Sequence, residues 1–140
     1  MEYLVLTGFT LLILGIMLVA AYSKMSSSQK AIDIDSAEKA VNRLKEAADF
    51  VYIHGHPTKL TVDVYFPPDI EKDYSFIGNK TIDLAIDVRG EHTDVWRSTR
   101  GDIGWDLYGS SEMPVSTGYY QLVVESTPYD QFGGMINIHD

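Results

Sequence analysis

The sequence predicts an α+β fold: a long N-terminal helix, hydrophobic at first and amphipathic later, followed by a small antiparallel β domain. Three observations predict it. Residues 3–23 form an uncharged, largely apolar run, apolar residues recur at intervals of three and four between Ile34 and Val51, and from Leu60 the period changes to two. The pattern leaves open whether the strands form a sandwich or a single sheet packed on the helix.

The first segment, residues 1–23, is predicted as a hydrophobic transmembrane or assembly helix. A helix rises about 1.5 Å per residue, so about 20 residues cover the roughly 30 Å hydrocarbon core of a bilayer. We expect the segment to be retained, because only Met1 and Glu2 precede the run and a secretory signal has a basic start. Gly8 and Gly15 share nearly one helix face, where backbones can approach closely, although glycine is common in membrane helices anyway.

The second segment, residues 24–56, is predicted as a polar exit and an amphipathic helix. It opens with a serine-rich stretch that suits a membrane exit. Asp35 and Glu38 have the spacing of a capping box, so the helix either restarts here or runs unbroken from the apolar run. Gly55 followed by Pro57 predicts its end.

The third segment, residues 57–140, is predicted as an acidic antiparallel β domain. Residues 60–66 alternate between apolar and polar side chains and stop at Pro67, which is typical of a half-buried strand. Turn residues separate the other candidate strands, which are residues 74–77, 82–88, 91–99, 104–108, 119–125 and 135–139.

Most of the net negative charge lies in the β domain. The chain has a formal net charge of -9. An acidic domain repels nucleic acid, so we expect no nucleic-acid partner. The sequence contains no cysteine, which excludes disulfides and thiolate metal sites.

Motifs for catalysis or metal binding are sparse. His54 and His56 could begin a metal site, but the helix-stop interpretation accounts for them. Residues 69–73 carry alternating acids, yet lack the glycine and final glutamate of a calcium loop. No nucleophile elbow, phosphate loop or zinc-protease motif occurs, so we expect neither an enzyme nor a cofactor.

Two further features concern the surface of the β domain. Asn79-Lys80-Thr81 is an N-glycosylation sequon in a predicted turn, with meaning only for a domain outside the cell. Trp96, Trp105 and the many tyrosines could form a sugar-binding surface, although aromatic residues in strands more often pack.

The start of the chain resembles that of archaeal type IV pilin-like proteins with class III signal sequences. The resemblance rests on the opening Met1-Glu2-Tyr3-Leu4-Val5-Leu6, the bare apolar helix, the Ala-rich residues 40–52, and residues 61–67. It covers about the first 70 residues. In that family a short basic leader is removed, and the mature chain opens close to Gln-x-Ser-x-Glu before its apolar helix. Glu2 stands where the family's glutamate would be, although that residue normally lies near the fifth mature position.

The resemblance implies a structural subunit of an extracellular, cell-adhesive type IV pilus-like filament. Its partners would be further copies of the chain, membrane lipid before assembly, a signal peptidase and the pilus assembly machinery. Glu2 would meet the N-terminal amine of a neighbouring subunit, as the family's glutamate is thought to do. The competing explanation for Glu2 is that the helix dipole favours an acid at a helix start.

Topology and the second function candidate depend on the same helix. Lys24 and Lys30 follow the apolar run, which taken alone would place the β domain in the cytoplasm, whereas a basic leader would reverse that. On the family's pattern we expect the domain outside the cell. The alternative function is a permanently membrane-anchored β-sandwich binding module, similar to motility-filament stators or surface-layer-binding proteins.

Overall fold

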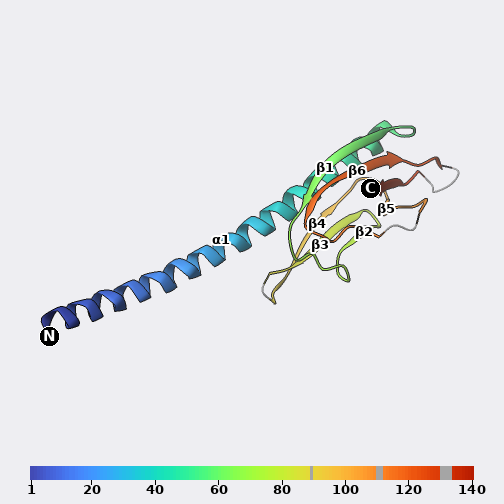
Figure 1. The fold of residues 1–140 in the computed structure, drawn as a ribbon. Helices are drawn as coiled ribbons and strands as arrows, with labels where there is room; N and C mark the ends of the chain where they lie inside the picture. The colour runs from blue at the N-terminus through green and yellow to red at the C-terminus, as the bar shows by residue number, and fades with distance from the viewer. Residues whose placement is uncertain (89, 110–111, 130–133) are drawn as a thin grey trace. The chain divides into compact units, whose positions relative to one another are not determined.

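The computed structural model describes residues 1–88, 90–109, 112–129 and 134–140. In these residues one helix precedes seven strands (Figure 1). The elements are α1 (Glu2–His54), β1 (Lys59–Phe66), β2 (Phe76–Gly78), β3 (Thr81–Asp87), β4 (His92–Ser98), β5 (Ile103–Trp105), β6 (Gly118–Ser126) and β7 (Ile136–His139). The chain divides into two compact units, Met1–Ile32 and Asp33–Asp140. The predicted α+β fold class is confirmed.

Helix α1 is continuous over 53 residues, so the serine-rich stretch does not break it. The Ser27 hydroxyl donates to the Ser23 carbonyl at 3.2 Å, which satisfies it within the helix. The predicted stop is confirmed at Gly55, whose φ of 68° is in the left-handed region. Its N–H donates to the carbonyl of Val51 at 2.9 Å and closes the last turn.

The strands of the second unit form a single curled sheet in the order β1-β6-β7-β5-β2-β3-β4. The single-sheet alternative is therefore the observed one. Neighbouring strands pair antiparallel except β5 and β7, which run parallel with Ile103 opposite Ile136. An entirely antiparallel sheet was expected, and this pair is a correction. The parallel contact joins two short segments far apart in sequence, and local turn signals carry no information about such pairings.

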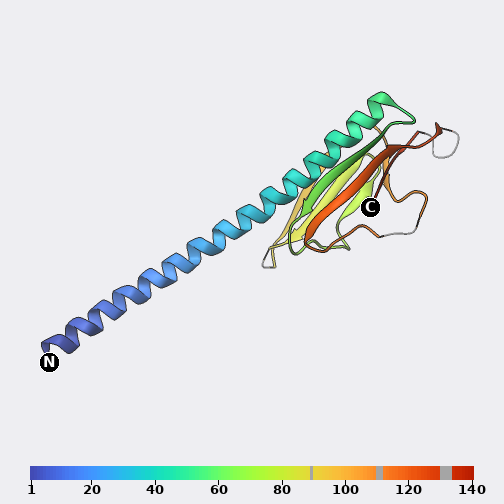
Figure 2. The ribbon, with the colours of Figure 1, turned by 45° about the horizontal axis from the view of Figure 1, so that its top comes forward.

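The core lies between one face of this sheet and residues 33–54 of α1, which run along that face (Figure 2). Four of the seven buried helix residues are alanines, so the helix backbone can approach the sheet closely. The buried helix side chains are Ala37, Ala40, Val41, Leu44, Ala47, Ala48 and Val51. The sheet contributes Val64, Phe66, Ile82, Leu84, Ile86, Val95, Ile103, Leu122, Val124, Ile136 and Ile138.

Both edge strands of the sheet are tied to α1 by arginine. Arg43 of α1 donates from Nη1 to the Asp63 carbonyl of β1 at 2.9 Å. At the other edge, Arg97 of β4 donates to Asn42 Oδ1 at 3.0 Å and to Glu38 Oε1 at 2.5 Å. The helix is thus fastened across the whole width of the sheet.

Asp49 fastens the segment after β4 to the helix. Its Oδ1 accepts the Arg100 backbone N–H at 2.8 Å, and its Oδ2 lies 2.5 Å from Lys45 Nζ. Burial raises the pKa of Asp49, but the hydrogen bonds from Lys45 and Arg100 and the nearby positive charges outweigh it, so the pKa is lowered overall. Gly101 allows this segment to lie close to the Tyr52 side chain of α1, since a Cβ at Gly101 would be 2.2 Å from Tyr52 Cδ2.

Candidate functional site

The N-terminal part of α1 is apolar on all sides and covered by nothing within the described chain. One 18-residue window has a mean hydropathy of 2.6 and is 0% buried. By length and composition it is able to cross a membrane. Its exposed large side chains include Leu4, Val5, Leu6, Phe9, Leu11, Leu12, Ile13, Leu14, Ile16, Met17, Leu18 and Val19. A helix that is apolar all round requires lipid or other apolar helices around it.

The hydroxyl groups in this apolar segment are satisfied by the helix itself. Thr7 Oγ1 donates to the Tyr3 carbonyl at 2.5 Å, and Thr10 Oγ1 donates to the Thr7 carbonyl at 2.8 Å. A hydroxyl without a partner would oppose burial by a few kcal/mol. Neither threonine therefore prevents this segment from entering an apolar environment.

Glu2 lies in the first turn of α1 and is exposed. It borders a shallow hollow of about 530 Å³ whose other lining residues are Met1, Val5, Leu6 and Phe9. A single carboxylate therefore stands beside an otherwise apolar surface. A partner that covers this hollow with apolar side chains would also need a group that neutralises the carboxylate or donates a hydrogen bond to it.

Gly8 and Gly15 leave room beside the helix. A Cβ added at either glycine would meet no atom within 4 Å. Gly15 borders a second hollow of about 510 Å³, whose lining includes Leu12, Ile16 and Val19, whereas Gly8 lines neither hollow. The structure thus places Glu2 and the glycines on one apolar helix but at separate positions, and their role in assembly stays a prediction.

Asn79 occupies the tip of the two-residue loop between β2 and β3. Its φ is 50° and that of Lys80 is 65°, both in the left-handed region. This conformation matches the right-handed twist of a hairpin. Both residues are exposed, so the sequon is accessible, and its glycosylation stays a prediction.

The two histidines after the helix contact different carbonyls. His54 Nδ1 lies 2.8 Å from the Phe50 carbonyl, and His56 Nδ1 lies 3.0 Å from that of Ser126. In the acidic loop after β1, Glu71 pairs with His92 and Lys72 pairs with Glu112. Over the residues that the structure describes, no group of three or more His, Cys, Asp or Glu side chains is placed to hold a metal ion.

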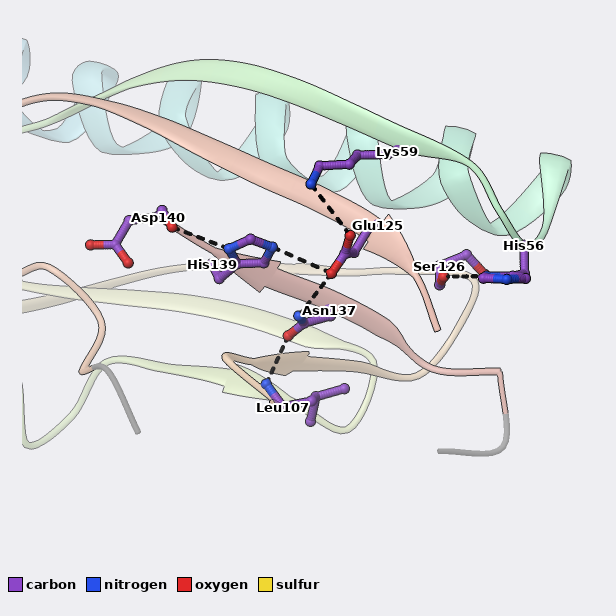
Figure 3. Close-up of polar contacts among 8 residues, drawn as sticks. All are labelled: His56, Lys59, Leu107, Glu125, Ser126, Asn137, His139 and Asp140. Atoms are coloured by element: carbon purple, nitrogen blue, oxygen red, sulfur yellow. Dashed lines mark hydrogen bonds and ion pairs between the residues drawn. The ribbon is translucent and has the colours of Figure 1, made fainter. Parts of the chain in front are cut away.

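A polar cluster that sequence patterns did not indicate lies on the sheet face opposite α1 (Figure 3). Glu125 of β6 lies 3.6 Å from Lys59 Nζ, 3.4 Å from His139 Nε2 and 3.4 Å from Asn137 Nδ2. Asn137 in turn accepts the Leu107 backbone N–H at 2.8 Å. The cluster joins three strands and the segment after β5. Because the partners pair with one another across the sheet, we interpret it as structural.

The two tryptophans have different surroundings. Trp105 packs half-buried against the core, which confirms the packing interpretation there. Trp96 points away from the core and is 59% exposed, so the same interpretation is wrong for it. Strand alternation in β4 offers a reason, since buried Val95 takes the helix side and Trp96 takes the other.

Comparisons with known proteins found no match to this chain among protein-family models, curated proteins or solved structures. The fold and its surfaces therefore carry the functional argument. Two exposed features bear on function: the apolar part of α1 and the side chain of Trp96.

Proposed function

We propose that this chain is a structural subunit of an extracellular type IV pilus-like filament. The observation that carries the proposal is the apolar window of α1, which has a mean hydropathy of 2.6 and is 0% buried within the chain. The N-terminal helices of many copies form the filament core by lateral packing. The acidic β domains lie on the outside.

The proposal accounts for the division of the chain into two units. Unit Asp33–Asp140 has its own core, so the apolar residues of unit Met1–Ile32 are not needed to fold it. These residues form a surface that suits lipid before assembly and other helices afterwards. The resemblance of the first residues to archaeal type IV pilin-like proteins supports the same function.

Glu2 has a defined role in the proposed filament. A carboxylate in an apolar core is costly unless it is paired. Pairing with the N-terminal amine of a neighbouring subunit neutralises it and fixes the axial register of adjacent helices. Gly8 and Gly15 allow neighbouring helices to approach closely at the same time.

The remaining expectations follow from assembly at the cell surface. The chain is inserted in the membrane before assembly, a signal peptidase processes it, and the pilus assembly machinery extracts it. The acidic outer surface keeps the filament soluble, because like-charged surfaces repel one another. Adhesion is the function we propose for the filament as a whole.

A charge-neutral replacement of Glu2 tests the proposal. Glu2→Gln keeps the shape of the side chain and removes the charge, so the full chain should still reach the membrane but enter filaments about tenfold less, equal to about 1.4 kcal/mol. The readout is the amount of chain in filaments sheared from cells against the amount in membranes. Glu46→Gln is the matched control, because Glu46 is exposed in the same helix but lies in the second unit.

The alternative, a permanently anchored binding module, gives a different result. In that case the wild-type chain stays in the membrane fraction, and sheared filaments contain none of it even when cells carry filaments. That outcome would reject the filament proposal in favour of the anchor.

A further inference from the structure

A carboxylate stands between two exposed aromatic residues on the sheet face opposite α1. In the register of the sheet, Asp83 of β3 pairs with Phe76 of β2 on one side and Trp96 of β4 on the other. Phe76 is 48% exposed and Trp96 is 59% exposed. Directly opposed residues share a face, and the neighbours Ile82 and Leu84 face the core. The three side chains therefore form one row across β2, β3 and β4.

A second carboxylate lies beside this row. Asp94 is exposed, two residues from Trp96 on the same face of β4, and opposite the small side chain of Ala85. Asp83 Oδ1 is enclosed and has no hydrogen-bond partner among the described residues. Burial, and secondarily the charge of Asp94, raise the pKa of Asp83. We refer to Phe76, Asp83, Asp94 and Trp96 together as the acidic aromatic row.

The row has the chemistry of a site for a positively charged side chain. A cation close to Asp83 and Asp94 would offset the repulsion between two carboxylates and the cost of burying one of them. The exposed face of Trp96 adds cation–π attraction. A neutral sugar could stack on Trp96 but would leave that repulsion in place, and a polyanion would be repelled.

One basic residue of the β domain, Lys80, has the charge and the exposure needed to bind the acidic aromatic row. Lys80 is exposed at the tip of the β2–β3 loop, and its carbonyl accepts the Thr99 N–H at 2.8 Å, which holds the tip in place. No contact of its side chain is found in the part of the chain that the structure describes. The other described basic residues from 33 to 140 each face an acid or a carbonyl: Lys39, Arg43, Lys45, Lys59, Lys72, Arg97 and Arg100.

We propose that the acidic aromatic row binds the Lys80 side chain of a neighbouring copy of this chain. The inference rests on the proposed filament, and it adds a second contact between subunits, made by the β domains. Each copy carries both halves of the contact, so its row can bind the Lys80 of one neighbour while its own Lys80 binds a second neighbour. Such a heterologous contact extends into an open helical assembly when its rotation does not close into a ring, which is the symmetry of a filament.

Cross-linking tests the contact directly, because the chain contains no cysteine. One full-length variant carries Asn79→Cys at the tip, and a second, differently tagged variant carries Ser98→Cys, two residues from Trp96 on the same face of β4. The two are co-expressed, and sheared filaments are treated with a mild oxidant. We expect a mixed disulfide dimer. The control partner is Gln121→Cys, exposed on β6 of the same sheet face, for which we expect no mixed dimer.

Charge reversal shows whether the side chains themselves make the contact. Lys80→Glu in the Asn79→Cys variant should lower the dimer yield at least about tenfold, and Asp94→Lys in the Ser98→Cys variant should restore it. Trp96→Ala in the Ser98→Cys variant should lower the yield about two- to thirtyfold through loss of the cation–π contact. A yield unchanged by Lys80→Glu would overturn the proposal, as would binding of a neutral sugar at Trp96 instead.

A separate cross-link distinguishes this proposal from the proposed function. Leu12→Cys lies in the apolar part of α1, and in sheared filaments with a helical core it should give dimers when treated with a flexible bismaleimide that spans more than the roughly 8–10 Å between packed helix axes. If Leu12→Cys cross-links and the Asn79→Cys and Ser98→Cys pair does not, the row does not bind Lys80 but the filament stands. If neither cross-links, both proposals are wrong.

Discussion

At the scale of single residues, Arg97 connects an edge strand to the helix. It donates to Asn42 at 3.0 Å and to Glu38 at 2.5 Å. Hydrogen bonds to charged groups contribute about 1.5–3 kcal/mol when shielded and less when partly exposed. Because Arg97 is about one-third exposed, we expect Arg97→Ala to lower the free energy of unfolding by about 1–2 kcal/mol.

Thermal unfolding of the full chain in detergent measures this change. The control is Lys39→Ala, whose ion pair with Asp35 joins two exposed residues of the same helix and contributes less than about 0.5 kcal/mol. Equal effects of the two substitutions would show that the hydrogen bonds from Arg97 to α1 do not stabilise the β4 edge.

Asp49 predicts a dependence of stability on pH. Its folded pKa is lowered, so it stabilises the fold above its unfolded pKa of about 4, and this contribution is lost as pH falls through the folded pKa. We expect Asp49→Asn to reduce the free energy of unfolding by about 1–2 kcal/mol at pH 7. The difference from wild type should shrink steadily below about pH 4.

Denaturant unfolding at a series of pH values checks the Asp49 prediction. Asp35→Asn is the matched control, because Asp35 also pairs with a lysine four residues away but is 59% exposed. A constant Asp49→Asn effect from pH 7 to pH 2 would show that the carboxylate charge does not contribute.

At the scale of elements, the packing of α1 on the sheet depends on its buried face. Leu44 is 0% exposed and Phe50 is 46% exposed on the same helix. Removing a buried leucine side chain leaves a cavity, so Leu44→Ala should cost about 2–5 kcal/mol. Phe50→Ala removes a larger side chain from the surface and should cost much less, as measured by chemical denaturation. Similar losses for both would mean that this face does not form the core.

The loop between β2 and β3 gives a prediction of increased stability. Lys80 has a φ of 65°, which glycine adopts more readily than lysine. Lys80→Gly should raise the free energy of unfolding by about 0.5–1 kcal/mol in the detergent-solubilised chain. Lys80→Ala is the control that distinguishes loss of the charge from relief of the backbone strain. It removes the charge but keeps the Cβ, so it should give no gain in thermal midpoint.

Most elements were predictable because their signals are local. Alternation and turn residues located all seven strands to within a few residues, and Gly55 with Pro57 located the end of α1. The parallel pairing of β5 and β7 was not predictable, because no hairpin links them and both are short. A strand over β4 implies that Val95 and Trp96 lie on opposite faces of the sheet. Which of the two faces the helix depends on packing against elements distant in the sequence.

At the scale of the whole molecule, the chain combines a unit with its own core and an apolar helix with none. Sequence alone indicated the apolar helix, since hydropathy is a local property. The acidic aromatic row depends on strand register across β2, β3 and β4, which sequence periodicity does not supply. The surface that we propose to bind Lys80 could therefore be identified only from the structure.

The central claim is that the apolar part of α1 is buried among copies of itself in a filament. Cryo-electron microscopy of filaments sheared from cells that carry the wild-type chain tests it most directly. We predict lipid-free filaments composed of this chain, with residues 3–23 of each copy packed in the core and the β domains outside. Filaments that lack the chain, together with its confinement to the membrane fraction, would contradict the claim.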